Sequence, residues 1–181
     1  KTVDTTYLNL DIAEERGFIH RDYIAHCFRW SHVCRQLMRA HRYKEARILD
    51  VGCGRFLPLG KLLYSNKMIP ALYHGVDVGP VDDDAFNMLA RGSFASALKV
   101  NEFQDLSEWP DIEMPNDESP KERYTDITCF EVLEHVEPEH CKRMLRKMLN
   151  FLEFNTGRTY LSTPCWDRRS CAANHVNEMR Y

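Results

Sequence analysis

Short apolar runs and amphipathic stretches alternate along this chain of 181 residues. Runs rich in branched and aromatic residues, bounded by glycine or acidic residues, predict buried strands, whereas leucines three or four residues apart predict helices. Strands that alternate with helices indicate an α/β fold with a mostly parallel sheet. The predicted strands lie within residues 47–54, 72–78, 97–103, 124–130 and 158–164, and the predicted helices within 18–43, 57–64, 81–91 and 137–154.

Two polar segments lie among these elements. Asp82, Asp83 and Asp84 stand near the start of the third predicted helix, where acidic residues complement the helix dipole. Residues 107–123 are rich in proline, aspartate, glutamate, asparagine and serine. This composition is too polar for a core and predicts an exposed loop.

The first predicted strand runs into a turn with two glycines one residue apart, Gly52 and Gly54, directly after Asp50. Glycine allows positive φ and close approach of the backbone to a ligand, and the following helix offers unpaired N–H groups at its start. The second strand ends in Asp77, where one carboxylate can accept hydrogen bonds from both hydroxyls of a ribose. These residues indicate a nucleotide-like ligand. The dinucleotide pattern G-x-G-x-x-G is not met, because Leu57 takes its third glycine position, and the Walker pattern is absent.

The glycine turn resembles motif I of the class I S-adenosylmethionine-dependent methyltransferases, whose pattern is D/E-x-G-x-G-x-G. The matching residues, 50–56, place Phe56 where the family has a third glycine. After the fourth predicted strand, residues 131–136 read E-V-L-E-H-V, which is similar to a frequent signature of small-molecule methyltransferases of this class. The resemblance covers roughly residues 46–164. It implies a doubly wound, mostly parallel sheet with helices on both faces.

The resemblance also implies how the chain is divided. Residues 1–45 are expected to form an N-terminal helical cap, and residues 46–181 the cofactor-binding methyltransferase domain, within one compact unit. In the family, a further helix and a final antiparallel strand pair follow the fifth strand. Residues 165–181 leave no room for that pair, so either the protein is unusually short or the sequence omits those strands.

An enzyme is implied that uses S-adenosylmethionine and methylates a small-molecule or nucleic-acid/nucleotide acceptor. By position, Asp77 is implied to hold the ribose, Asp105 with Leu106 the adenine, and Phe130 with Glu131 to border the reacting centre. The implied cofactor-binding residues are Asp50, Gly52, Cys53, Gly54, Asp77, Val78, Asp105, Leu106, Phe130 and Glu131. The catalytic candidates, as bases or substrate contacts, are Glu131, His135 and His175.

A metal-assisted alternative rests on Glu131, Glu134, His135 and His175. The pattern E-x-x-E-H with a later histidine resembles the metal site of the small-RNA 3′-terminal 2′-O-methyltransferases, where a divalent ion binds the terminal ribose hydroxyls. Two carboxylates and two imidazoles suit Mn²⁺, Fe²⁺ or Zn²⁺ better than Ca²⁺. Because E-V-L-E-H-V also occurs in metal-free relatives, we expect no metal and keep the metal-assisted RNA methyltransferase as the alternative.

Charge is distributed unevenly along the chain. The net charge of −3 gives no overall case for nucleic-acid binding. Between residues 16 and 47, however, eight lysines and arginines and four of the eight histidines stand against two acidic residues. This basic segment favours a phosphate-bearing acceptor, although a solvated helix face explains the same charges. The candidate acceptor contacts are His20, His26, Arg29 and His32.

Cysteine usage and hydropathy bear on location. Seven cysteines without a C-x-x-C pair, no secretory signal, and no apolar run of about 18 residues predict a cytoplasmic protein with no membrane partner. The sequence indicates no oligomeric state. A catalytically silent domain that binds the cofactor or a partner protein is a third possibility, because Phe56 and the missing final strands depart from the family pattern.

Overall fold

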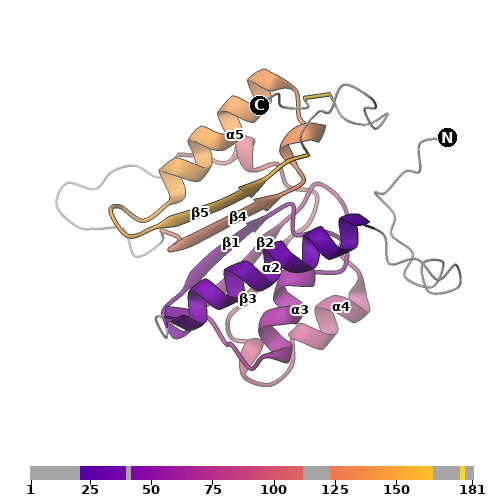
Figure 1. Ribbon diagram of the computed structural model, residues 1–181, viewed down its shortest axis with the longest axis vertical. Helices are drawn as coiled ribbons and strands as arrows, with labels where there is room; N and C mark the ends of the chain where they lie inside the picture. Colours follow the sequence, from indigo (N-terminus) through magenta and orange to yellow (C-terminus); the bar gives the residue numbers. More distant parts are fainter. Residues whose placement is uncertain (1–20, 40–41, 112–122, 165–175, 178–181) are drawn as a thin grey trace, which may run out of the picture.

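A five-stranded sheet forms the centre of the protein (Figure 1). The computed structural model describes residues 21–39, 42–111, 123–164 and 176–177. Within them all neighbouring strands are parallel, in the order β3-β2-β1-β4-β5. The strands are β1 (Arg47–Val51), β2 (Leu72–Val76), β3 (Leu98–Asn101), β4 (Asp126–Phe130) and β5 (Arg158–Ser162). The predicted parallel α/β sheet is confirmed.

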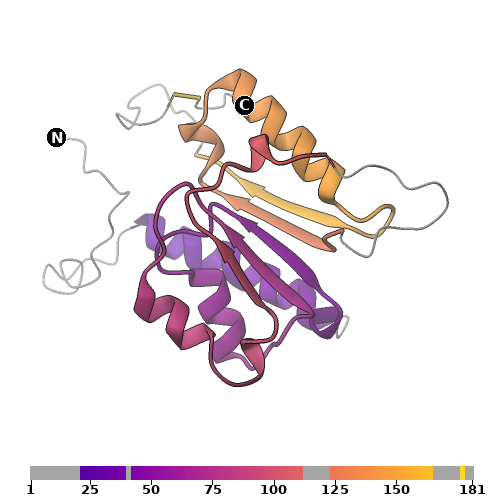
Figure 2. The same cartoon turned by 180° about the vertical axis from the view of Figure 1, so that it is seen from behind.

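Helices cover both faces of the sheet (Figures 1 and 2). One face carries α2 (Arg21–Arg39), α3 (Pro58–Ser65) and α4 (Asp83–Leu89), and the other carries α5 (Pro138–Phe151). The doubly wound arrangement is therefore confirmed. Short 3₁₀ helices connect these elements: η2 (Arg42–Lys44), η3 (Gly92–Phe94), η4 (Leu106–Glu108) and η5 (Leu133–His135). No helix in the described ranges has the length and apolar character needed to cross a membrane.

The sheet separates two hydrophobic cores. Successive side chains of a strand point to opposite faces, so Ile48 joins the core beneath α2 and α3 while Leu49 joins the core beneath α5. Leu37 of α2 is fully buried in the first core, and Met148 of α5 is buried in the second. Helix α2 thus packs directly on the sheet.

Local sequence explains two helix starts. Asp82 caps α4 by accepting a hydrogen bond from the Ala85 N–H at 3.0 Å, as the acidic run predicts. Before α3, Leu57 has φ of 47° and is fully buried. A left-handed conformation costs a residue with a Cβ about 1–2 kcal/mol. Burial of the Leu57 side chain offsets that cost, while its neighbour Phe56 is 50% exposed. The turn thus ends in an exposed Phe56, where the family pattern has its third glycine, followed by a left-handed leucine.

The prediction of an exposed loop over residues 107–123 is wrong at both ends. Residues at its start belong to η4, and Trp109 is half-buried with its ring edge-on to Phe151 at 5.7 Å. At its far end Arg123 is buried, with its guanidinium 4.3 Å from the centre of the Phe154 ring. Contacts with α5 and the residues that follow it outweigh the polar composition of this segment.

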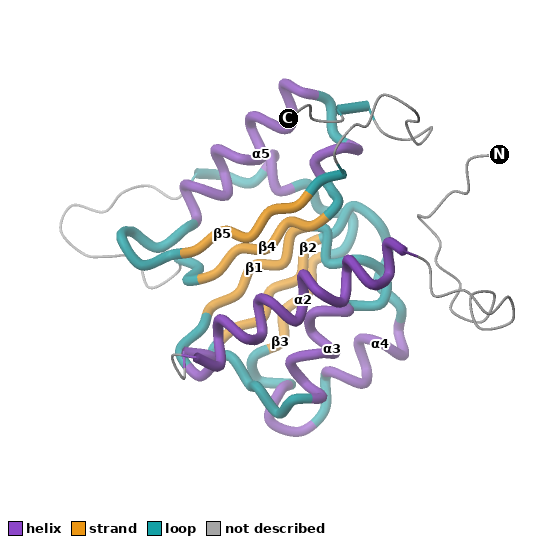
Figure 3. The backbone as a smooth tube through the Cα atoms, in the orientation of Figure 1, coloured by secondary structure: helices purple, strands orange, loops and turns teal. Residues whose placement is uncertain are grey.

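All five strands end at the same edge of the sheet. The loops that follow β1, β2 and β4 therefore gather there, as the teal segments of Figure 3 show. In an open parallel sheet, ligands bind outside the carboxyl ends of the strands. Most of the predicted site residues lie at this edge.

Candidate active site

The glycine turn after β1 is fixed against β2. The Gly52 N–H donates to the Val76 carbonyl at 2.8 Å. Gly52 and Gly54 have φ of 67° and 69°. A Cβ atom on Gly52 would lie 2.2 Å from Cγ2 of Val132, whereas a Cβ atom on Gly54 would meet only Pro58, at 4.0 Å. The turn therefore requires glycine at position 52, whereas the backbone at position 54 has free space beside its Cα atom.

Asp77, just beyond the end of β2, is joined to this turn. Its Oδ2 accepts from the Gly54 N–H at 2.9 Å, and its Oδ1 accepts from the Gly79 N–H at 2.8 Å. A carboxylate offers about four acceptor sites, so these two bonds leave each oxygen able to accept another. Val78, beside it, is 70% exposed. The structure thus brings Asp77 and Gly54 together at the carboxyl ends of β2 and β1.

Asp50 lies beneath the turn. Its side chain is buried, and its two oxygens accept from Tyr73 Oη and Thr128 Oγ1, each at 2.6 Å. Burial raises the pKa of this carboxyl from 3.8 to about 6, against the lowering effect of the two hydroxyl donors. Cys53 is also buried, and burial raises the pKa of its thiol. Both side chains support the turn from within the first core.

The raised pKa of Asp50 predicts a specific pH dependence. A carboxyl whose pKa is higher in the folded state contributes stability that is complete below the unfolded value of 3.8 and is lost as the pH rises through about 6. The loss is about 3 kcal/mol by neutral pH. We expect Asp50→Asn to remove this dependence, so that urea denaturation shows wild type losing more stability than the variant between about pH 4 and pH 8. Parallel pH profiles for the two proteins would contradict this account.

Asp105 directly precedes η4, and its side chain pairs with a residue of α5. Its Oδ1 accepts from the Ser107 N–H at 2.8 Å, and its Oδ2 lies 2.6 Å from Nε2 of His140. The same nitrogen lies 2.7 Å from Ser107 Oγ. Leu106 is buried in the second core. The sequence gives no signal for the pairing with His140, because the partners lie on separate elements far apart in the chain.

Glu131 directly follows β4 and has φ of 56°. Its Oε1 accepts from Ser162 Oγ at 2.9 Å and lies 3.1 Å from the Arg29 guanidinium. Phe130, the preceding residue, packs against the first core. Arg29, a predicted acceptor contact, therefore joins α2 to the end of β4. The positive φ of a glutamate at this place is a strained conformation held by its surroundings.

Glu134 and His135, two other residues of the metal alternative, differ in burial. The Glu134 side chain is buried, with Oε1 at 3.9 Å from Nε2 of the more exposed His135. The Glu134 carbonyl accepts from the Val176 N–H at 2.8 Å. His175 lies outside the described residues. Among those that are described, no group of three or more histidine, cysteine or acidic side chains is arranged to hold a metal ion.

Comparison with known families gives one match over most of the chain. A family model described as a methyltransferase domain matches residues 23–181. A search of curated proteins gives no match.

Several solved structures are similar at low sequence identity. Magnesium protoporphyrin IX methyltransferase from Synechocystis PCC 6803, with bound SAH, is 21% identical over 71% of this chain and 52% of that chain, with a TM-score of 0.49. The methyltransferase domain of bacterial CtHen1 is 18% identical over 68% and 59%, with a TM-score of 0.49. A cyclopropane-fatty-acyl-phospholipid synthase-like protein from Lactobacillus casei ATCC 334 is 16% identical over 68% and 45%, with a TM-score of 0.47. The chain thus spans about half the length of these solved chains.

Proposed function

Because this chain belongs to the family of methyltransferase domains, we propose that it binds S-adenosylmethionine at the carboxyl ends of β1 and β2 and directs methyl transfer to an acceptor near the end of β4. The observation that carries the proposal is the Asp77 carboxylate, fixed by the N–H groups of Gly54 and Gly79 beside the glycine turn. Two oxygens held in this way suit a pair of adjacent ribose hydroxyls.

The residues present fit this cofactor. Asp77 retains acceptor capacity on both oxygens, and the backbone at Gly54 is open enough for close approach of a ligand. Asp105 and Val78 are the proposed neighbours of the adenosine part, and Asp50 supports the turn from below. S-adenosylmethionine, when bound, supplies a methyl group on a positively charged sulfur.

The protein's part in the reaction is positioning. Transfer from a sulfonium is an in-line displacement, and correct alignment of donor and acceptor supplies about 7–11 kcal/mol of the barrier reduction in well-oriented reactions. Phe130 and Glu131 are the proposed border of the reacting centre, where Ser162 and Arg29 fix the Glu131 side chain. Where the acceptor must lose a proton, Glu131, His135 and His175 are the proposed bases.

The proposed acceptor is a small molecule or a nucleotide or nucleic acid, and the proposed location is the cytoplasm. The five cysteines in the described part of the chain are free thiols, which suits a reducing compartment.

Titration calorimetry with S-adenosylmethionine and S-adenosylhomocysteine tests the proposal. We expect both to bind the purified chain with dissociation constants of about 1–100 μM, and chelation to leave these values unchanged. No heat with either ligand would contradict the proposal. Metal analysis of the same sample distinguishes a metal-independent enzyme from the metal-assisted alternative. Methyl transfer to any acceptor would exclude a catalytically silent domain.

A further inference from the structure

A cavity lies on the α5 face of the sheet, away from the glycine turn. Its volume is about 320 Å³. Two pairs of register partners form its floor: Arg47 beside Leu72, and His74 beside Lys99. Leu72 and His74 are two residues apart on β2, so their side chains share a face. None of the residues predicted to bind the cofactor lines this cavity.

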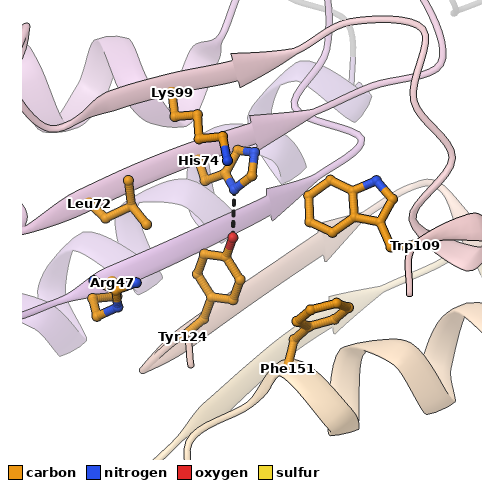
Figure 4. Close-up of a pocket in the computed structure, with 7 residues that line it drawn as sticks. All are labelled: Arg47, Leu72, His74, Lys99, Trp109, Tyr124 and Phe151. Atoms are coloured by element: carbon orange, nitrogen blue, oxygen red, sulfur yellow. Dashed lines mark hydrogen bonds between the residues drawn. The ribbon is translucent and has the colours of Figure 1, made fainter. Parts of the chain in front are cut away.

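Aromatic rings form one wall of the cavity (Figure 4). The Trp109 ring lies edge-on to Phe151 at 5.7 Å, and Phe151 lies edge-on to Tyr124 at 6.4 Å. The imidazole of His74 is 5.3 Å from Trp109, with 31° between the ring planes. Trp109 directly follows η4, Tyr124 lies just before β4, His74 lies in β2, and Phe151 ends α5. Such a wall offers flat apolar surface to a planar ligand.

Two side chains of the lining are positively charged. Arg47 and Lys99 line the cavity, and no acidic side chain of the described residues does. Arg47 Nε donates to the Arg123 carbonyl at 3.0 Å. Neither cation forms an ion pair with a described carboxylate. A cationic lining in a chain of net charge −3 is suited to an anionic group.

A buried polar pair stands between the wall and the cations. His74 is 1% exposed, and its Nδ1 lies 2.5 Å from Tyr124 Oη, as the dashed line in Figure 4 shows. Burial and the charge of Lys99 lower the pKa of His74 to about 4, against the raising effect of a hydrogen bond with the Asn101 side chain, so the ring is neutral at physiological pH. The imidazole thus hydrogen-bonds to side chains from outside its own strand, Tyr124 and Asn101.

We propose that this cavity is a second binding site, separate from the cofactor site, for a small planar aromatic molecule that carries a carboxylate or phosphate group. The ring packs against Trp109 and Phe151, and the anionic group is held by Lys99 and Arg47.

Calorimetric titration of the full chain with indole-3-acetate, and with indole as its uncharged counterpart, tests this assignment. We expect the acid to bind at least about tenfold more tightly than indole. In Lys99→Gln the acid should lose most of this preference, whereas Lys44→Gln, which removes an exposed charge outside the cavity, should keep it. Phenyl phosphate, titrated in parallel, shows whether phosphate serves as well as carboxylate.

A second measurement shows whether indole-3-acetate binds apart from the proposed cofactor site. Saturating indole-3-acetate should change the affinity for S-adenosylmethionine by less than about twofold, because the two sites share no residue. Three results overturn the assignment: no saturable binding of the acid, a preference that Lys99→Gln leaves intact, or displacement of S-adenosylmethionine by the acid. Failure of S-adenosylmethionine to bind would contradict the proposed function and leave the test of this cavity unaffected.

Discussion

Replacing Asp77 with alanine is expected to weaken S-adenosylmethionine binding by about 2–4 kcal/mol, or roughly 30- to 1000-fold in the dissociation constant. The change removes the two charge-assisted hydrogen bonds that we propose Asp77 makes to the ribose. It also frees the N–H groups of Gly54 and Gly79, which Asp77 holds in place. Titration calorimetry measures the affinity, and thermal unfolding checks that the variant is folded.

Asp84→Ala is the matched control for this experiment. It makes the same change of charge at an exposed position of α4, where the side chain has no part in the glycine turn. We expect less than about a twofold change in affinity for this variant. Equal affinities of Asp77→Ala and wild type would remove Asp77 from the cofactor site.

Gly52→Ala is expected to destabilise the fold by about 2–5 kcal/mol. Part of the cost is conformational, because Gly52 has φ of 67°. The other part is steric, because the added Cβ would lie 2.2 Å from Cγ2 of Val132, and a β-branched side chain has little freedom to move away. The difference in free energy of unfolding, from urea denaturation of both proteins, gives the total.

Gly92→Ala separates the two parts of that cost. Gly92 also has positive φ, 57°, but an added Cβ atom there would meet nothing within 4 Å. We expect a destabilisation of only about 1 kcal/mol. If Gly52→Ala lowered the free energy of unfolding no more than Gly92→Ala does, the Val132 side chain would have to move away from the added Cβ atom. The steric explanation would then be wrong.

The elements of the fold follow from local sequence. Apolar runs that end in Asp50 and Asp77 predict β1 and β2, and leucine spacing with a proline in the first turn predicts α3. The strand order and the pairing of β1 with β4 depend on contacts between distant segments, which periodicity does not encode. The left-handed Leu57 is unexpected for the same reason, since burial in the core outweighs the local preference of leucine.

The candidate site also has residues that the sequence predicts and pairings that it does not. The glycine turn and Asp77 are recognisable because each lies at a strand end and its chemistry is local. The pairing of Asp105 with His140, and that of His74 with Tyr124, join elements that the sequence treats separately. A histidine within an apolar strand reads as ordinary core, so the cavity on the α5 face has no signal in the sequence.

The strand order also bears on how the chain acquires its structure. β1 pairs with β2 after a single helical connection, whereas its other neighbour, β4, comes much later in the chain. Closing the longer loop costs more chain entropy, and synthesis delivers the first half earlier. We therefore expect the unit from β1 to β3 to fold first. The contact between Asp77 and Gly54 lies wholly within that unit, so the proposed ribose-binding residues come together before β4 and β5 join the sheet.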